Sequence, residues 1–206
     1  MNAQTLPRTP VAILDEFLVA EEWNGLLAYS LSNEAEFRNT QVVGRDGGGV
    51  LDPATRRSRV LYDLGPYRAV FAERLMRFFP HVLMRLGHEP FPVSQLEIQL
   101  TATNHGEFFR MHSDNDAYGV QGRRITFVYF FHSEPLAFEG GQLRIFDTEA
   151  HADRRSAPTG AYRLVYPQQN QIVFFASWCW HEILPVACPS SRFADSRFTV
   201  NGWYHQ

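Results

Sequence analysis

The chain has 206 residues, 45% of them hydrophobic, and a formal net charge of −3 at pH 7. This length and composition are typical of one compact domain with a single core. The small negative charge argues against the basic surface that nucleic-acid binding needs, and no apolar run is long enough for a membrane span, so we expect neither partner. The N-terminus lacks the apolar core of a signal peptide, which predicts a cytoplasmic protein. Cys179 and Cys188 match no zinc or disulfide spacing and are expected to be free thiols.

The N-terminal part of the chain predicts two helices. Apolar residues recur at three- and four-residue spacing from Trp23 to Leu31, which indicates one amphipathic helix. A longer stripe begins after Pro66 and ends at Gly87, because proline suits the first turn of a helix and glycine its end. Between the two, residues 43–59 contain four glycines and predict an irregular loop, either a lid or a solvent-exposed loop.

After residue 92 the pattern changes to that of strands, in which apolar and polar residues alternate or form short apolar runs. Such segments occur at 96–100, 125–131, 141–146, 161–166, 172–176, 179–186 and 197–204. Many short strands separated by Gly, Pro and Asn indicate a sandwich or barrel. We therefore expect a single, mainly β domain over residues 1–206, with 1–91 as a mostly helical support and 92–206 as the β core. The polar stretch 148–160 is expected to be a solvated connection.

The tripeptide His112-Ser113-Asp114 carries the clearest chemical signal. It lies in a segment with strand character, and strand residues i and i+2 point to the same face, so His112 and Asp114 can meet at one point. His181, in a later aromatic and β-branched run, can supply a third ligand. Two histidines and one carboxylate form the facial triad of non-heme Fe(II) oxygenases, which leaves open coordination positions. The alternative is a surface pair in a turn, since Ser113 and Asn115 favour turns.

Four motifs together carry a family resemblance. They are His112-Ser113-Asp114, Gly140-Gly141-Gln142-Leu143-Arg144-Ile145-Phe146, His181 followed by Pro185-Val186, and Arg197-Phe198-Thr199-Val200-Asn201-Gly202-Trp203. With these motifs the chain resembles the Fe(II)/2-oxoglutarate-dependent dioxygenases, and among them the prolyl 4-hydroxylase-like branch, over about residues 90 to 206. The resemblance implies a double-stranded β-helix, a distorted jelly roll, packed against two or more helices.

The same resemblance implies the composition of the site. His112, Asp114 and His181 would bind Fe(II), with 2-oxoglutarate as co-substrate, dioxygen as a reactant and ascorbate as an additional reductant. No catalytic residue beyond the metal ligands is implied.

The distal carboxylate of 2-oxoglutarate needs a buried cation, and a guanidinium suits it because it stays charged and offers two parallel donors. We expect Arg197 in this role, with Thr199 and Asn201 beside it on the same strand face. Arg192 is the rival, because family members usually place the basic residue closer to the second histidine. The candidate for a hydroxyl partner of the co-substrate is Tyr129.

The resemblance implies a hydroxylase whose first candidate substrate is a prolyl residue in a peptide or protein. Asp114 favours hydroxylation over halogenation, because related halogenases have a small residue at that position. The substrate can alternatively be a free amino acid or a natural-product small molecule, since pocket-lining loops set this choice. In a different class, the barrel is a non-catalytic, cupin-like metal-binding module, which would not need Arg197 and its polar strand neighbours.

Overall fold

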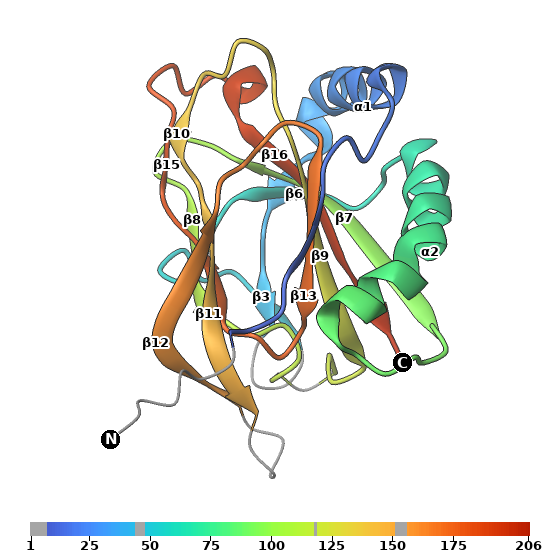
Figure 1. Ribbon diagram of the computed structural model, residues 1–206. Helices are drawn as coiled ribbons and strands as arrows, with labels where there is room; N and C mark the ends of the chain where they lie inside the picture. The colour runs from blue at the N-terminus through green and yellow to red at the C-terminus, as the bar shows by residue number, and fades with distance from the viewer. Residues whose placement is uncertain (1–7, 44–47, 118, 151–155) are drawn as a thin grey trace.

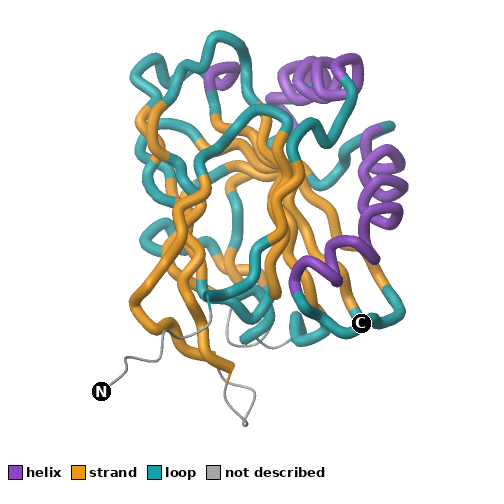
Figure 2. The backbone as a smooth tube through the Cα atoms, in the orientation of Figure 1, coloured by secondary structure: helices purple, strands orange, loops and turns teal. Residues whose placement is uncertain are grey.

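The computed structural model describes residues 8–43, 48–117, 119–150 and 156–206 (Figure 1). In this part of the chain two β-sheets face each other, and two α-helices lie on the outer side of one sheet (Figure 2). The arrangement confirms the expected mainly β fold with helices from the N-terminal half. Neither helix combines the length and apolarity needed to cross a membrane, and the cytoplasmic location stays a prediction.

Both α-helices lie where the hydrophobic spacing predicts them. They are α1 (Ala20–Ser32) and α2 (Tyr67–Leu86), and two short 3-10 helices are η1 (Glu34–Glu36) and η2 (Phe193–Asp195). Pro66 precedes α2, where its missing N–H costs the helix no hydrogen bond. Gly87 ends α2 in the left-handed region at φ 62°, a conformation that favours glycine. Proline and glycine thus fix the two ends of α2.

The larger sheet has seven strands in the spatial order β1, β13, β9, β16, β7, β6 and β2. In chain order their bounds are β1 (Ala12–Leu14), β2 (Arg38–Asn39), β6 (Arg59–Leu61), β7 (Gln95–Thr103), β9 (Arg123–Phe131), β13 (Gln171–Ala176) and β16 (Arg197–His205). Three short strands from the N-terminal region therefore extend a sheet whose other four strands come from the predicted β core.

The smaller sheet has five strands in the order β12, β11, β14, β8 and β5. Their bounds are β5 (Arg56–Arg57), β8 (Phe108–His112), β11 (Leu143–Ala150), β12 (Ser156–Val165) and β14 (His181–Ile183). Two further pairs join β3 (Val42–Val43) to β4 (Gly49–Val50) and β10 (Glu139–Gly140) to β15 (Val186–Ala187). Strands β7, β9, β13 and β16 of the larger sheet alternate along the chain with β8, the β11–β12 hairpin and β14 of the smaller sheet. This alternation is the expected double-stranded β-helix.

Three stretches differ from the sequence expectations. Residues 43–59 are not one irregular loop, because β4, β5 and the start of β6 lie in them; residues 44–47 lie outside the described part of the chain. The expected strand 179–186 is split into β14 and β15 around Pro185, which has no N–H for a ladder. The stretch 148–160 is strand at both ends, because β11 and β12 pair as far as Ala150 and Ser156.

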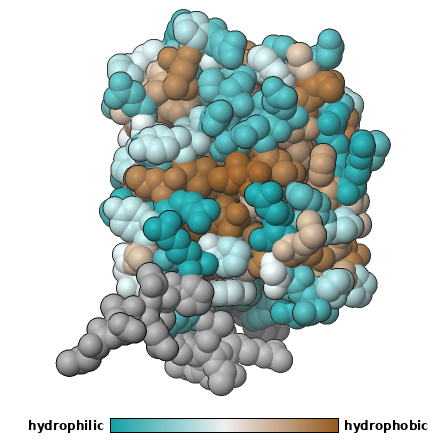
Figure 3. Space-filling view, viewed as in Figure 1, coloured by the Kyte–Doolittle hydropathy of each residue, from teal (hydrophilic) through white to brown (hydrophobic). Residues whose placement is uncertain are grey.

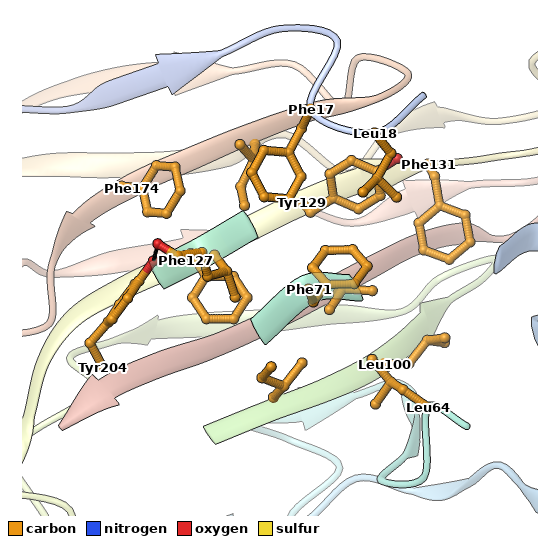
Figure 4. Packing of buried hydrophobic residues seen from close by; sticks show 14 of the residues in the cluster. Phe17, Leu18, Leu64, Phe71, Leu100, Phe127, Tyr129, Phe131, Phe174 and Tyr204 are labelled. Atoms are coloured by element: carbon orange, nitrogen blue, oxygen red, sulfur yellow. Dashed lines mark hydrogen bonds between the residues drawn. The ribbon is translucent and has the colours of Figure 1, made fainter. Parts of the chain in front are cut away.

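The main core lies between the helices and the larger sheet. Figure 4 shows Tyr129 packed near Phe17 and Phe71, with ring centroids 5.8 and 5.2 Å away. Phe71 comes from α2, so this contact joins the helix to β9. The same view shows Phe127 and Tyr204 from neighbouring strands. These aromatic side chains fix the outer face of the sheet, and the inner face is left for other residues.

A second apolar layer, which includes Phe130, Leu143 and Phe175, is buried around the inner faces of the two sheets. On the face shown in Figure 3, an apolar band crosses the middle, over the region of β11 and β13, between more hydrophilic zones. Close packing of the buried layer that includes Phe130, Leu143 and Phe175 holds the two sheets at a fixed separation. A pocket between the sheets lies at the end of the barrel that carries the three expected ligands.

Candidate metal centre

Three side chains from two strands and one turn form a compact cluster. His112 ends β8 and His181 begins β14, and these residues are partners in the antiparallel register. Asp114 lies just beyond β8, so its expected place on the same strand as His112 is wrong. Its backbone N–H donates to the Ser177 carbonyl at 2.9 Å, and this contact turns the carboxylate back toward the histidines. One ligand atom from each of the three residues lies within 4.8 Å of the others.

Hydrogen bonds orient both imidazoles toward the centre of the cluster. The Nδ1–H of His112 donates to the Arg110 carbonyl at 2.7 Å, and that of His181 donates to the Cys179 carbonyl at 2.9 Å. In each ring Nε2 is then the free acceptor, which is the usual arrangement of a metal-binding histidine. Burial lowers the pKa of His181 to about 4, so its ring is neutral and able to bind a metal at neutral pH.

The carboxylate of Asp114 faces both rings. Its Oδ1 lies 3.5 Å from Nε2 of His112, and its Oδ2 lies 3.4 Å from Nε2 of His181. Thr126 donates its hydroxyl to Oδ2 at 2.7 Å. Burial alone would raise the pKa of Asp114, but the two histidines and the hydrogen bonds outweigh it and hold the pKa below its usual value. A carboxylate together with two imidazoles is a ligand set that suits Fe(II).

The cluster lies between an inner pocket and a wider outer cavity. The inner pocket has a volume of about 60 Å³ and the outer cavity about 620 Å³. Five residues line both spaces and form what we term the throat: Arg56, Phe109, His112, Asp114 and Trp203. His112 and Asp114 therefore face both spaces, whereas His181 faces the inner pocket.

Arg197 lines the inner pocket, and its side chain is buried with 2% exposure. Its Nε and Nη2 have no hydrogen-bond partner among the described residues. Burial lowers the pKa of Arg197 to about 9, so the guanidinium is still charged at neutral pH. An unpaired buried charge is costly, and a carboxylate that binds both nitrogens would remove most of this cost. This fits the distal carboxylate of 2-oxoglutarate.

Gly141 makes room for this guanidinium. Its φ is 63°, and a Cβ added at this position would lie 2.6 Å from Cδ of Arg197, which is closer than real Cβ contacts. Thr199 and Asn201 follow Arg197 on the same face of β16 and line the same pocket, as the strand period predicts. Thr101 donates to Oδ1 of Asn201 at 2.9 Å, which fixes that side chain.

Arg192 and Tyr129, the two other residues considered for contact with the co-substrate, lie away from the inner pocket. Arg192 lies at the surface, where its Nε is 2.8 Å from Oδ2 of Asp195, and it does not line the inner pocket. Tyr129 was expected to offer its hydroxyl to the co-substrate, and this is wrong. Its ring belongs to the helix-facing core (Figure 4), and its hydroxyl donates to Oδ1 of Asn170 at 3.0 Å. The tyrosine points away from the pocket because its strand neighbours Val128 and Phe130 point inward.

Sequence reasoning missed two residues of the site. Thr126 was a polar interruption in an apolar run, and the structure gives it the hydrogen bond to Asp114. Arg56 belongs to the stretch 43–59, which was expected to be a loop, and it lines the throat. The role of Thr126 could have been inferred from a threonine inside a buried apolar strand. No sequence pattern places Arg56 at the site, because β5 reaches the site only by pairing with β8.

Comparisons with known proteins agree with this geometry. The sequence model of the 2OG-Fe(II) oxygenase superfamily matches residues 98–205. An uncharacterized PKHD-type hydroxylase from Synechocystis sp. (strain ATCC 27184 / PCC 6803 / Kazusa) is 35% identical over 192 residues, which are 92% of this chain. The chain spans 61% of the length of that relative.

Among solved structures, a Pseudomonas putida prolyl-4-hydroxylase has a TM-score of 0.65 at 20% identity, covering 96% of this chain and 93% of its own. A Trichoplax adhaerens prolyl hydroxylase, in complex with a hypoxia inducible factor oxygen degradation domain peptide fragment, has a TM-score of 0.65 at 18% identity, covering 96% and 84%. At these identities the likeness concerns the fold. The match to the superfamily covers just over half of the residues and includes His112, Asp114, His181 and Arg197, and the chain therefore belongs to the 2OG-Fe(II) oxygenase superfamily.

Proposed function

We propose that the chain is an Fe(II)- and 2-oxoglutarate-dependent hydroxylase that acts on a prolyl residue of a peptide or protein. The observation that carries this proposal is the buried guanidinium of Arg197, whose Nε and Nη2 have no hydrogen-bond partner among the described residues, in the same pocket as His112, Asp114 and His181. A cupin-like module that only binds a metal would not need this cation. With Fe(II) and 2-oxoglutarate bound, the centre would use dioxygen to oxidise a C–H bond while 2-oxoglutarate becomes succinate and carbon dioxide.

The residues of the chain would contribute placement. His112, Asp114 and His181 would hold the metal on one side, and Thr126 would keep the carboxylate of Asp114 in position. Arg197 would bind the distal carboxylate of 2-oxoglutarate, with Thr199 and Asn201 beside it. Apolar walls from Phe108, Leu143 and other pocket residues would limit access of water.

The substrate would occupy the outer cavity. This space is about ten times larger than the inner pocket, and the β3–β4 pair forms part of its wall through Val42, Val43 and Gly49. A broad cavity that leads to the metal ligands suits an extended chain better than a small molecule. The prolyl choice is supported by the PKHD-type hydroxylase relative and by the peptide bound to the Trichoplax adhaerens enzyme. A free amino acid or natural product would need only the space near the throat.

The test is turnover with defined substrates. Purified protein with Fe(II), 2-oxoglutarate and proline-containing peptides should release succinate faster than without peptide, and the peptide should gain one oxygen atom at proline by mass spectrometry. The H181A variant is the control for the metal centre. Turnover confined to free amino acids would reject the peptidyl substrate and leave the dioxygenase chemistry in place. Metal binding without succinate formation under any condition would favour the non-catalytic module.

A further inference from the structure

Arg56 is a second guanidinium near the metal ligands. It comes from β5 at the edge of the smaller sheet, where it is the register partner of Phe109 in β8. Its guanidinium carbon lies 4.6 Å from the centroid of the Phe109 ring, and that ring stacks on His112 at 3.6 Å between centroids. The stack places the positive charge of Arg56 in the throat, where the side chain lines both the inner pocket and the outer cavity.

Within the described residues, Arg56 makes one side-chain hydrogen bond, from Nε to the Ser58 hydroxyl at 3.2 Å. Its two terminal nitrogens have no acceptor and no ion-pair partner there. The charge of Asp114 raises the pKa of Arg56, but its carboxylate faces the two histidines of the metal site. Burial lowers the pKa of Arg56 to about 10, so the group remains a cation at neutral pH.

The other acids of the outer cavity do not neutralise Arg56. Glu97 forms a bidentate contact with Arg123, with a closest distance of 2.8 Å, and also lies 3.1 Å from Nε2 of His205. Asp52 accepts the hydroxyl of Thr55 at 2.6 Å inside its own turn. Asp116 is exposed at the rim. Among the residues that the structure describes, Arg56 is therefore a cation of the throat without an ion-pair partner.

A count of the charges around the metal also leaves the charge of Arg56 uncompensated. In the loaded site the charge of Fe(II) would cancel that of the 2-oxoglutarate dianion, and Arg197 would cancel Asp114. Arg56 would then leave the throat with one net positive charge as the substrate arrives. A partly buried guanidinium with free donors favours an anion that accepts two parallel hydrogen bonds, which is the geometry of a carboxylate.

We propose that Arg56 is a specificity-determining residue that binds a carboxylate of the prolyl substrate, next to the carbon that is oxidised. The proposal rests on the proposed hydroxylase function and narrows its substrate class to acidic prolyl compounds. The carboxylate has two sources: the side chain of an acidic residue adjacent to proline, or the C-terminal carboxylate of a chain that ends in proline. Both present the same group to the same guanidinium.

The experiment compares substrates that differ only in charge. Capped peptides with Glu-Pro are paired with Gln-Pro, capped peptides with Pro-Glu with Pro-Gln, and peptides ending in a prolyl carboxylate with the same peptides ending in prolinamide. Binding is measured by calorimetry under anaerobic conditions with Fe(II) and 2-oxoglutarate present, and turnover by succinate release in air. In the wild-type protein the acid of at least one pair should bind about tenfold or more tighter than its amide. The pair that shows the difference identifies the source of the carboxylate.

Three variants test the assignment to Arg56. R56Q should bring the acid-to-amide ratio close to one, whereas R56K should retain part of it because the charge stays. R57Q is the matched control: Arg57 is the next residue of β5, but its side chain is exposed, donates from Nε to the Pro53 carbonyl at 3.0 Å and lines neither cavity. It should leave the ratio unchanged. The visible band of the Fe(II)–2-oxoglutarate chelate should persist in all three variants, which shows that the metal centre is intact.

Equal binding of acid and amide in the wild-type protein overturns the proposal, and so does the absence of binding by every pair. If R56Q mainly raises the 2-oxoglutarate requirement, Arg56 serves the co-substrate and the proposal is wrong. The proposed function fails differently: the chelate band or succinate formation would be absent in the wild-type protein itself. Hydroxylation of acidic and amide peptides at equal rates would retain the function and reject the role of Arg56.

Discussion

The two faces of the larger sheet are built from the same strands and have opposite characters. The helix-facing side is almost entirely apolar and aromatic, whereas the side that faces the smaller sheet carries hydroxyl, amide and guanidinium groups at the pocket, beside the second apolar layer. In β16, Phe198, Val200 and Tyr204 belong to the first side and Arg197, Thr199 and Asn201 to the second. Because strand residues alternate between faces, β16 supplies one residue to the helix-facing core and the next to the site. A substitution at one position of this strand is therefore expected to affect stability, and a substitution at the next position is expected to affect the site.

The largest expected effect concerns His112, Asp114 and His181, which line the same pocket as the inner face of the larger sheet. H181A should abolish the chelate band in anaerobic titration with Fe(II) and 2-oxoglutarate, because it removes one of three ligands. Loss of outer-shell partners alone costs metal affinity about 10–100-fold, so the loss of a ligand should exceed this. H81A is the control, since His81 is exposed on α2. An unchanged band and metal stoichiometry in H181A would show that the cluster does not bind the metal.

On the helix-facing side, F127A should lower the free energy of unfolding by about 3–5 kcal/mol, because Phe127 is fully buried and its removal leaves a cavity. Denaturant unfolding followed by circular dichroism measures this loss. At temperatures where the variant remains folded, the 2-oxoglutarate requirement should stay near that of the wild type. A large change in that requirement, with little loss of stability, would contradict the division between the two faces.

For Arg197 we expect weaker 2-oxoglutarate binding without a loss of stability, which is the opposite of the result expected for F127A. R197L should weaken 2-oxoglutarate binding by about 2–5 kcal/mol, because a charge-assisted contact to a carboxylate is lost. Without 2-oxoglutarate its thermal stability should be unchanged or higher, because the wild-type protein buries a guanidinium with two nitrogens that no described residue pairs. Thermal unfolding with and without 2-oxoglutarate, at fixed metal concentration, separates these effects. R192L is the matched control, and if it has the larger effect on binding, the role passes to Arg192.

The smallest effect is expected at Tyr129. Y129F removes the hydroxyl that donates to Asn170, and this should lower the free energy of unfolding by about 0.5–1.5 kcal/mol. Asn170 keeps the N–H of Leu18 as a donor to the same oxygen, so no buried acceptor is left without a partner. The 2-oxoglutarate requirement should not change. A clear rise in that requirement would mean that the hydroxyl acts in the inner pocket after all.

Local signals accounted for much of the fold. The spacing from Trp23 to Leu31 and the stripe between Pro66 and Gly87 match α1 and α2. Most of the expected strands lie at their predicted places because their apolar residues are also the buried ones. The short strands β2 to β6 were not predicted, because they contain two or three residues each and exist only through their pairing partners. Such segments are too short for any periodicity to appear.

By itself the sequence predicted the candidate ligands His112, Asp114 and His181 and the candidate cation Arg197, because residue type limits which atoms can bind a metal or a carboxylate. Only the tertiary structure decided which candidates lie on the same side of the barrel. The register between β9 and β16 opposes Tyr129 to Val200 on the core side, which removed Tyr129 from the site. The pairing of β5 with β8 brought Arg56 to the throat from a distant part of the chain. Strand pairing joins residues far apart in sequence and sets which face each one occupies, and neither follows from a local pattern.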